Sequence, residues 1–297
     1  MRQHPVIINL LSFILMMSSC AQSAKERNAA IVAQWVGKQL VIPDRLVYTI
    51  AGDTINYDPL DADFTIVTYI GPEECRECNM RLLKWKDEIA LFNTDPEIDI
   101  NFLMVVETNN PMEVIRLQKS NQFKFPISID TIGLFRQTND TFPNKTELRT
   151  FLINNLGEVL AIGSPVLNPN IRKIYLRIAG FEPKSESYPA EVSIQVKSLG
   201  LLNFNDSAKV SFSIYNTSQK QLDISGTIES CDCMTTKISG NTISPGDNEI
   251  VTLTVHGDST TSRKSVDVYF EGLEQPLHLK TISFAKKQPA VTQLHQN

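Results

Sequence analysis

Two cysteines two residues apart, Cys75 and Cys78, are the residues of this sequence most suited to chemistry. They follow an apolar, β-branched run and a Gly71-Pro72 break, and they open a segment with helical periodicity. Cysteines at this spacing on the first turn of a helix can close a small disulfide ring and reopen it. The first thiol lies near the positive end of that helix, where unpaired N–H groups favour thiolate. The spacing therefore predicts thiol–disulfide exchange in this segment.

The residues beside the two cysteines act on the thiolate in opposite directions. Arg76 and the helix terminus favour the thiolate of Cys75. Three carboxylates oppose it through like-charge repulsion, those of Glu73, Glu74 and Glu77. Three acids against one base predict a less acidic and more reducing pair than that of a strong oxidant.

Zinc binding is the alternative for this cysteine spacing, since structural zinc sites also use it. Zinc would need further cysteine or histidine ligands nearby, and the four histidines lie outside the central part of the chain, at His4, His256, His278 and His295. A formal net charge of −5 provides no electrostatic case for nucleic-acid binding. We therefore expect no metal at Cys75 and Cys78, no cofactor and no nucleic-acid partner.

Strands and helices alternate on either side of the cysteine pair. The chain of 297 residues exceeds the usual length of one domain, so two domains are expected. Hydrophobic periodicity in the first of them predicts strands at 64–70, 98–106 and 125–129, a hairpin over 150–162, and helices at 79–92, 112–119 and 168–179.

This order, with the CxxC between a strand and a helix, resembles the thioredoxin fold of the membrane-tethered periplasmic branch related to TlpA and ResA. The resemblance covers the chain from about Ala30 to Phe181 and includes the strand 150–154 with its glycine turn. It implies that Cys75 is the nucleophile and that Cys78 resolves the mixed disulfide. It also implies that the partners are thiols or disulfides of exported proteins and a membrane redox protein.

Two positions depart from the pattern of that family. A cis-proline usually precedes the strand that begins at Thr150, and Leu148-Arg149 stand there instead. Glu74 replaces the tryptophan often found before the first cysteine. The active-site loop predicted from the resemblance therefore consists of Glu74, Arg76, Glu77, Leu148 and Arg149. A stabilising or vestigial disulfide without turnover is the competing interpretation of the cysteine pair.

The first twenty residues read as a targeting signal. Arg2 is followed by an apolar run too short to span a bilayer and then by Ser18-Ser19-Cys20. Small residues before a cysteine resemble the lipobox of bacterial lipoproteins, which implies a signal peptide over 1–19, a lipid anchor on Cys20 and a tether over 20–28. An ordinary secretory signal cut nearby is the alternative. Either interpretation predicts that the mature protein functions outside the cytoplasm. We expect a lipid-anchored cell-envelope protein that faces the periplasm.

A change of period marks the second domain. Residues 29–183 form the first domain, and the polar, proline-bounded stretch 184–190 reads as a linker. Beyond it, apolar residues alternate with polar ones around 192–196, 210–214, 251–255 and 266–270, which indicates an antiparallel β-sandwich over 191–287. Several separated motifs there resemble the DUF1573 family of immunoglobulin-like modules, among them the segments 212–217, 230–235 and 243–246. Residues 288–297 read as a disordered tail.

Cys231 and Cys233 are a second pair, with a single residue between them. In a regular strand their Cα atoms would lie about 6.5 Å apart with parallel side chains, so a disulfide needs a bulge or a turn. Structural cysteines, exchange with Cys75 and Cys78, and a metal site with His256 or His278 all remain open.

The sequence thus predicts an α/β thioredoxin-like domain followed by an all-β immunoglobulin-like sandwich. Its predicted function is reductive thiol–disulfide exchange on exported proteins at Cys75 and Cys78. The alternative is a non-catalytic envelope module that binds proteins and holds structural disulfides.

Overall fold

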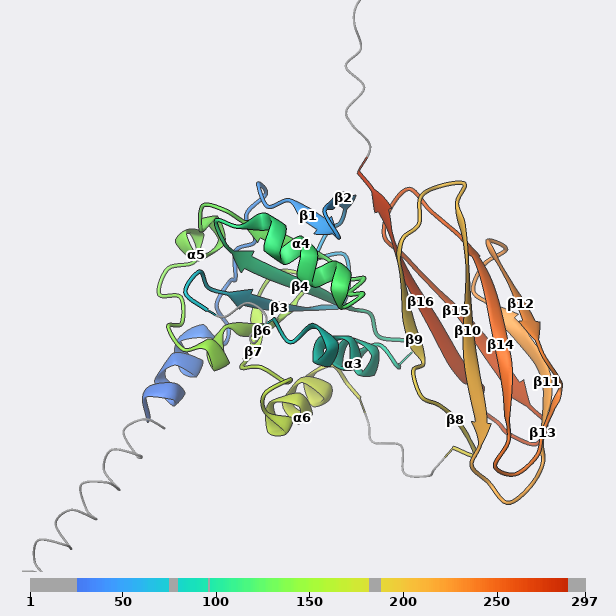
Figure 1. Cartoon of the computed structure of the whole chain (residues 1–297). Helices are drawn as coiled ribbons and strands as arrows, with labels where there is room; N and C mark the ends of the chain where they lie inside the picture. The colour runs from blue at the N-terminus through green and yellow to red at the C-terminus, as the bar shows by residue number, and fades with distance from the viewer. Residues whose placement is uncertain (1–25, 75–79, 96, 182–187, 288–297) are drawn as a thin grey trace, which may run out of the picture.

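The computed structural model describes residues 26–74, 80–95, 97–181 and 188–287 (Figure 1). The described residues form an α/β unit (residues 26–181) and a β-sandwich (residues 188–287). The predicted signal peptide, the predicted anchor at Cys20, the start of the predicted tether and the predicted tail lie outside the described residues, as do Cys75 to Cys78. None of the helices that the structure describes is long and apolar enough to cross a membrane.

The α/β unit has one sheet with helices on both faces. A helix over residues 26–35 precedes it. The strands are β1 (Tyr48–Ile50), β2 (Asp53–Asn56), β3 (Phe64–Ile70), β4 (Ile100–Glu107), β5 (Ile127–Asp130), β6 (Thr150–Asn154) and β7 (Val159–Ile162). The helices are α3 (Leu82–Phe92), α4 (Pro111–Ser120), α5 (Leu134–Thr138), the 3-10 helix η1 (Thr146–Leu148) and α6 (Pro169–Ile178).

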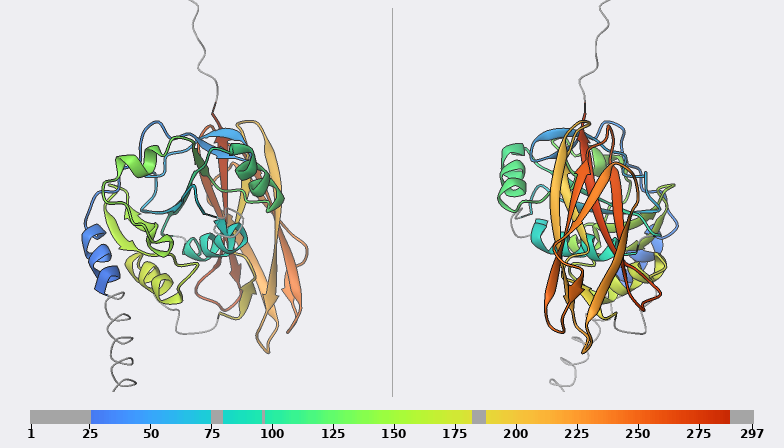
Figure 2. Two further views of the ribbon diagram at one scale, coloured as in Figure 1. Left: turned by 60° about the vertical axis from the view of Figure 1, so that its left-hand side comes forward. Right: turned by 90° about the vertical axis from the view of Figure 1, so that its right-hand side faces the viewer.

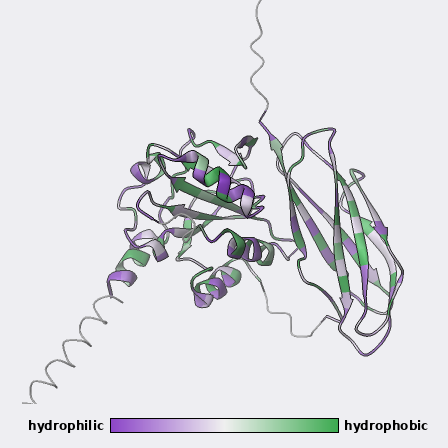
Figure 3. Cartoon of the chain, viewed as in Figure 1, coloured by the Kyte–Doolittle hydropathy of each residue, from purple (hydrophilic) through white to green (hydrophobic). Residues whose placement is uncertain are grey.

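The central strands β3 and β4 are parallel and buried on both faces, which explains their nearly continuous apolar sequences (Figure 3). Ile66 and Ile70 of β3 pack in the cluster that contains α3, α4 and α6. Val67 and Tyr69 point to the opposite face and pack with the N-terminal helix and α5. The alternation of a strand therefore divides the core into two layers.

The periodicity located the elements of the α/β unit well. Strand β3 has the predicted bounds, and the other predicted strands and helices differ at their ends by up to three residues. Gly180 ends α6 with φ +85°, as expected of a glycine C-cap. Helix α5 and η1 were not predicted, because segments of five and three residues are too short to show a helical period.

The β-sandwich consists of strands alone. One sheet has the order β12-β14-β10-β8 and the other contains β13, β11, β15, β16 and β9. Figure 3 shows hydrophobic and hydrophilic residues alternating along its strands. The bounds are β8 (Ala190–Val192), β9 (Val196–Leu201), β10 (Ser207–Asn216), β11 (Leu222–Glu229), β12 (Met234–Ile238), β13 (Thr242–Ile243), β14 (Asn248–His256), β15 (Ser262–Phe270) and β16 (Leu277–Lys286).

The period of two predicted a single strand through Val192, Ile194 and Val196. The structure has two strands there instead. Val192 ends β8, which pairs with β10, and Val196 begins β9, which pairs with β16 in the other sheet. Ile194 lies between them and is 43% exposed. Periodicity cannot register this change of sheet, because both short strands keep the same alternation.

Strand β16 joins the two units. Its end pairs with β2 at Ala285–Asn56 and Lys286–Ile55, so strands of the α/β unit and of the sandwich form one 12-stranded sheet. Figure 2 shows the sandwich against the α/β unit from two further sides. Charged contacts reinforce the junction. Lys280 Nζ lies 3.1 Å from Asp99 Oδ1, and Arg263 Nε lies 3.7 Å from the same oxygen.

Phe284 of β16 belongs to the apolar core of the α/β unit. Its ring centroid lies 5.9 Å from that of Tyr57 and 6.5 Å from that of Phe125, and the residue is 3% exposed. Burial of an aromatic side chain across the junction makes the two units stabilise each other.

Replacing this residue, Phe284→Ala, is expected to lower the free energy of unfolding by about 3–5 kcal/mol, because it removes a buried ring and leaves a cavity. Urea unfolding followed by circular dichroism measures the change. The matched control is Phe204→Ala, since Phe204 is 64% exposed. Equal effects of the two substitutions would contradict a shared core at the junction.

Candidate functional site

The candidate site lies at the carboxyl ends of β3 and β4, where the chain leaves the centre of the sheet. In α/β sheets this edge is where ligands and reactive groups gather. The amino end of β4 contacts the sandwich through Asp99 and Asn101. Glu107, at the other end of β4, is seven residues from Ile100, or about 23 Å along the strand. The site therefore faces away from the sandwich (Figure 1).

Glu107 is the centre of a hydrogen-bonded group on this edge. Its Oε2 accepts a hydrogen bond from the Tyr69 hydroxyl. Arg136 of α5 binds the same carboxylate with both prongs of its guanidinium, Nη2–Oε1 at 2.9 Å and Nε–Oε2 at 3.1 Å. Gly133, before α5, has φ +68°, and a Cβ there would lie 2.8 Å from Glu107 Oε1. A glycine is required where α5 begins against this carboxylate.

The hydrogen bonds determine the ionisation of these groups. Burial alone would raise the pKa of Glu107, but hydrogen bonds from Arg136 and Tyr69 outweigh it and lower that pKa below its ordinary value. Burial, and then the hydrogen bond to Glu107, raise the pKa of Tyr69. Near neutral pH, Glu107 is a carboxylate and Tyr69 a neutral phenol. Neither is poised to transfer a proton.

Arg149 lies immediately before β6, at the position that the family resemblance assigns to a cis-proline. Its guanidinium forms an ion pair with Glu74. It also donates to two carbonyl oxygens, Nε to Pro143 O at 2.9 Å and Nη2 to Asn144 O at 3.0 Å. The Arg149 carbonyl accepts from Tyr69 N at 2.9 Å, which ties it to β3. The described residues contain no cis peptide bond.

Glu74 is held on both sides. The Glu74 side chain is 9% exposed, and its Oε1 accepts from Gly71 N at 3.3 Å as well as from Arg149. A Cβ at Gly71 would lie 2.8 Å from Arg149 Nη1, so a side chain there would have to displace the guanidinium. The other oxygen, Glu74 Oε2, is buried without a partner among the described residues. The residue directly before Cys75 therefore has a fixed position.

The structure brings together only part of the predicted site. Glu74 and Arg149 form an ion pair, and Leu148 is buried in the core beside Tyr69. Four predicted residues, Cys75, Arg76, Glu77 and Cys78, lie outside the described residues. Sequence reasoning missed Tyr69, Glu107 and Arg136. A signal for Glu107 did exist, since a lone carboxylate at the end of a nearly continuous apolar strand requires a cationic partner if it is buried.

Cys231 and Cys233 form a disulfide with a Cα–Cα distance of 5.2 Å. They lie on the turn between β11 and β12, which satisfies the requirement for a break in the strand. Both residues are half-buried, and the residue between them, Asp232, is exposed.

The metal interpretation of this second pair does not fit the structure. Both thiols are consumed in the disulfide, and His278 is engaged with Asp267 at 2.6 Å. Among the described residues, no group of three or more histidine, cysteine, aspartate or glutamate side chains is arranged to hold a metal ion.

Comparisons with known proteins identify one domain. Residues 191–283 match the family described as "Protein of unknown function (DUF1573)". No curated protein matches this chain.

Solved structures resemble parts of the chain. The thioredoxin domain of a thiol-disulfide oxidoreductase from Bacteroides vulgatus is 10% identical with a TM-score of 0.35, over 47% of this chain and 97% of that one. A protein of unknown function from Porphyromonas gingivalis W83 is 13% identical with a TM-score of 0.29, over 34% of this chain and 50% of that one. The VesB protease of Vibrio cholerae is 13% identical with a TM-score of 0.30, over 47% of this chain and 45% of that one. This chain thus spans half or less of the last two structures.

The substitution Glu107→Gln is expected to lower the free energy of unfolding by about 1–3 kcal/mol at pH 7, because Arg136 loses a charged acceptor. The pKa of Glu107 in the folded state lies below its unfolded-state pKa of about 4.3, so its carboxylate stabilises the fold at a pH above that unfolded-state pKa. This stabilisation is lost as the pH falls through the folded-state pKa. The difference from the wild type should therefore shrink below about pH 4. Urea unfolding between pH 3 and pH 8 measures it.

Glu147→Gln is the control for that series, since Glu147 is an exposed glutamate. A pH-independent difference for Glu107→Gln would show that the carboxylate is not stabilised as an anion.

Replacing both cysteines of the second pair, Cys231→Ser with Cys233→Ser, is expected to cost only about 1.5 kcal/mol. A disulfide that closes a loop of three residues removes little entropy from the unfolded chain. The midpoint of urea unfolding with and without the double substitution measures this. A loss beyond about 3 kcal/mol would instead identify the bond as an important structural crosslink.

Proposed function

We propose that this chain is an extracytoplasmic thiol–disulfide oxidoreductase with a thioredoxin-like domain, in which Cys75 is the nucleophile and Cys78 the resolving cysteine. The observation that supports this proposal most is the position of the CxxC in the chain, between a strand and a helix. It comes directly after Glu74, at the carboxyl end of the buried central strand β3, and α3 follows it.

The arrangement of the sheet supports the thioredoxin-like part of the proposal. Four strands have the order β4-β3-β6-β7, with β3 parallel to β4 and antiparallel to β6. This is the strand order expected of a thioredoxin-like core, and it leaves the end of β3 flanked by β4 and β6. The immunoglobulin-like classification of the β-sandwich rests in the same way on its two packed antiparallel sheets.

The proposed step conserves electrons between two dithiol–disulfide pairs. The Cys75 thiolate attacks one sulfur of a substrate disulfide, forms a mixed disulfide and releases the other substrate sulfur as a thiolate. The Cys78 thiolate then attacks the sulfur of Cys75, which closes the Cys75–Cys78 disulfide and releases the second substrate thiol. A membrane dithiol protein returns the pair to the reduced state.

The ion pair of Glu74 changes the charge balance around the proposed nucleophile. Counting charges along the sequence set Glu73, Glu74 and Glu77 against Arg76. Arg149 neutralises one of these acids from another part of the chain. The repulsion that opposes thiolate formation is therefore weaker than the local sequence indicates. The reductive direction rests on the remaining two acids.

The envelope location belongs to the same proposal. A lipid anchor on Cys20 would hold the protein at a membrane surface facing the periplasm, with exported proteins as its substrates. In an oxidising compartment the Cys231–Cys233 disulfide persists.

A non-catalytic protein-binding module is the second candidate. The observation that favours it is Arg149, which stands in place of the cis-proline and binds Glu74 beside the CxxC. An arginine there changes the groove in which thioredoxin-like enzymes hold their substrates.

Insulin reduction by the chain with Cys20→Ser distinguishes the two candidates. We expect turnover that falls to the uncatalysed rate with Cys75→Ser, because the attacking thiolate is lost. Cys78→Ser should instead accumulate a mixed disulfide visible by mass spectrometry. The control is the double substitution Cys231→Ser with Cys233→Ser, which should retain turnover. Wild-type activity no higher than that of Cys75→Ser would favour the binding module.

A further inference from the structure

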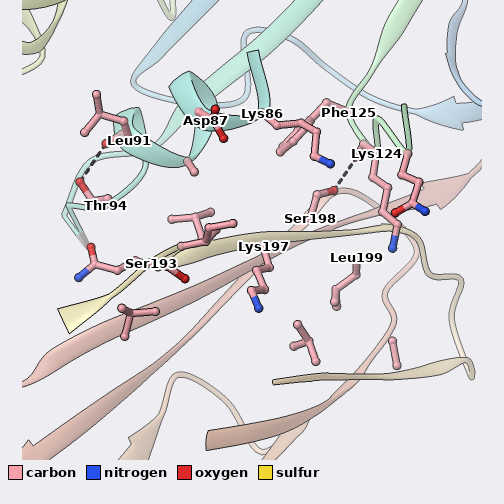
Figure 4. Close-up of a pocket in the computed structure, with 18 of the residues that line it drawn as sticks. Lys86, Asp87, Leu91, Thr94, Lys124, Phe125, Ser193, Lys197, Ser198 and Leu199 are labelled. Carbon is pink, nitrogen blue, oxygen red and sulfur yellow. Dashed lines mark hydrogen bonds between the residues drawn. The ribbon is translucent and has the colours of Figure 1, made fainter. Parts of the chain in front are cut away.

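A cleft of about 740 Å³ lies between the two units (Figure 4). Helix α3 and the segment before β5 form one wall. The segment from Val192 to Leu199 and the start of β10 form the other. Apolar side chains are exposed on both walls, with Leu91 at 39% and Ile194 at 43%.

Strand β9 runs through this cleft as an edge strand. It pairs in parallel with β16, and it pairs with no other strand that the structure describes. Lys280 N donates to Gln195 O, so the backbone groups of Gln195 turn toward β16 and those of Val196 and Ser198 turn away. No strand that the structure describes pairs with this outward edge. Ser198 is half-buried, whereas Val196 is 3% exposed, so a strand that adds along the edge has to displace the groups that cover Val196.

The two faces of β9 open into different parts of the cleft. In Figure 4, Ser198 points toward the side of α3, where its hydroxyl binds the Lys124 carbonyl. Lys197 and Leu199 point to the opposite side, toward β10. A strand added along this edge would place alternate side chains in these two spaces.

The charges of the cleft have predominantly one sign. Four lysines line it against one acid, Asp87. Two of them, Lys86 and Lys124, come from the α/β unit, and the other two, Lys197 and Lys209, come from the β-sandwich. Each face of β9 therefore has cationic side chains within the same cleft.

Lys197 is the most constrained of the four. Its Nζ donates to Ser211 O at 2.6 Å and lies 4.9 Å from the centroid of the Phe212 ring. Burial lowers its pKa, and the ion pairs among the described residues include none to Lys197. A ligand carboxylate beside it would supply a partner of opposite charge.

We propose that this cleft binds an acidic segment of a polypeptide in extended conformation, which adds as a strand to the free edge of β9. The backbone edge accounts for an extended chain, the apolar walls for alternating apolar side chains, and the four lysines for acidic ones. The inference goes beyond thiol exchange, because no residue of the cleft belongs to the candidate site. It assigns the junction of the two units a role in holding a partner protein.

The test uses a fluorescein-labelled peptide of eight alternating valine and glutamate residues and measures fluorescence anisotropy with the full chain. Saturable binding is expected, and it should weaken as salt rises. The double charge reversal Lys86→Glu with Lys209→Glu should raise the Kd at least about tenfold, because like charges then face the glutamates. Neither lysine side chain forms a hydrogen bond or ion pair within the part of the chain that the structure describes, so the variant should fold, which circular dichroism checks.

Three controls make the result specific. Lys237→Glu changes an exposed lysine on β12 outside the cleft and should leave the Kd within about twofold. A peptide with lysine in place of glutamate should bind at least about tenfold more weakly. A valine–glutamate peptide methylated on alternate backbone nitrogens should also lose affinity, because strand addition needs those donors.

Several outcomes would overturn the proposal. These are the absence of saturable binding at millimolar protein, a Kd unchanged by the double reversal, and equal binding of the lysine peptide or of the methylated peptide. Repeating the titration with Cys75→Ser separates this inference from the proposed enzyme. Binding should persist in that variant whether or not the wild type reduces insulin.

Discussion

The pairing of β16 with β2 is the interaction on which the arrangement of this molecule depends. The main-chain contact is short: Ala285 pairs with Asn56, Lys286 pairs with Ile55, and Lys287 N donates to Thr54 O at 2.9 Å. The junction is stable because other interactions surround it. Phe284 is buried in the core of the α/β unit, and Lys280 reaches Asp99 and two carbonyl oxygens, Asp95 O at 3.3 Å and Ile98 O at 3.5 Å. Buried charges are tolerated there because each is paired.

This junction determines where the cleft and the candidate site lie on the molecule. It holds β9 opposite α3, which creates the cleft and leaves one strand edge unpaired. It also attaches the sandwich at the amino end of β4, so that the carboxyl ends of β3 and β4 remain clear of it. The cleft and the candidate site are therefore separate surfaces, and a partner bound at one would not block the other.

On the candidate site, two arginines compensate two buried carboxylates. Arg136 binds Glu107, and Arg149 binds Glu74, while the Arg149 guanidinium also lies 5.7 Å from the centroid of the Tyr69 ring. Because both acids are already paired, this part of the site positions the chain without transferring protons. The chemistry proposed for this edge belongs to the cysteines that follow Glu74. The second cysteine pair, Cys231 and Cys233, lies in the sandwich, away from this edge.

The sequence by itself determined the local structure. Its apolar runs located β3 and β4, because a strand buried on both faces must be apolar throughout, and its period of two indicated the β-sandwich. It also indicated that a disulfide between Cys231 and Cys233 needs a turn, since the strand spacing is fixed by backbone geometry. Such features depend only on neighbours along the chain.

Only the tertiary structure decided the interactions between distant residues. Arg149 and Glu74 are 75 positions apart, and Lys280 and Asp99 are 181 positions apart. Nothing in the local pattern of either partner identifies the other, because many surface side chains have the same charge. The change of sheet between Val192 and Val196 was hidden for a similar reason, since alternation shows which side of a strand is buried and not which strand lies beside it. The partners of a buried charge and of a strand edge are set by how the elements pack.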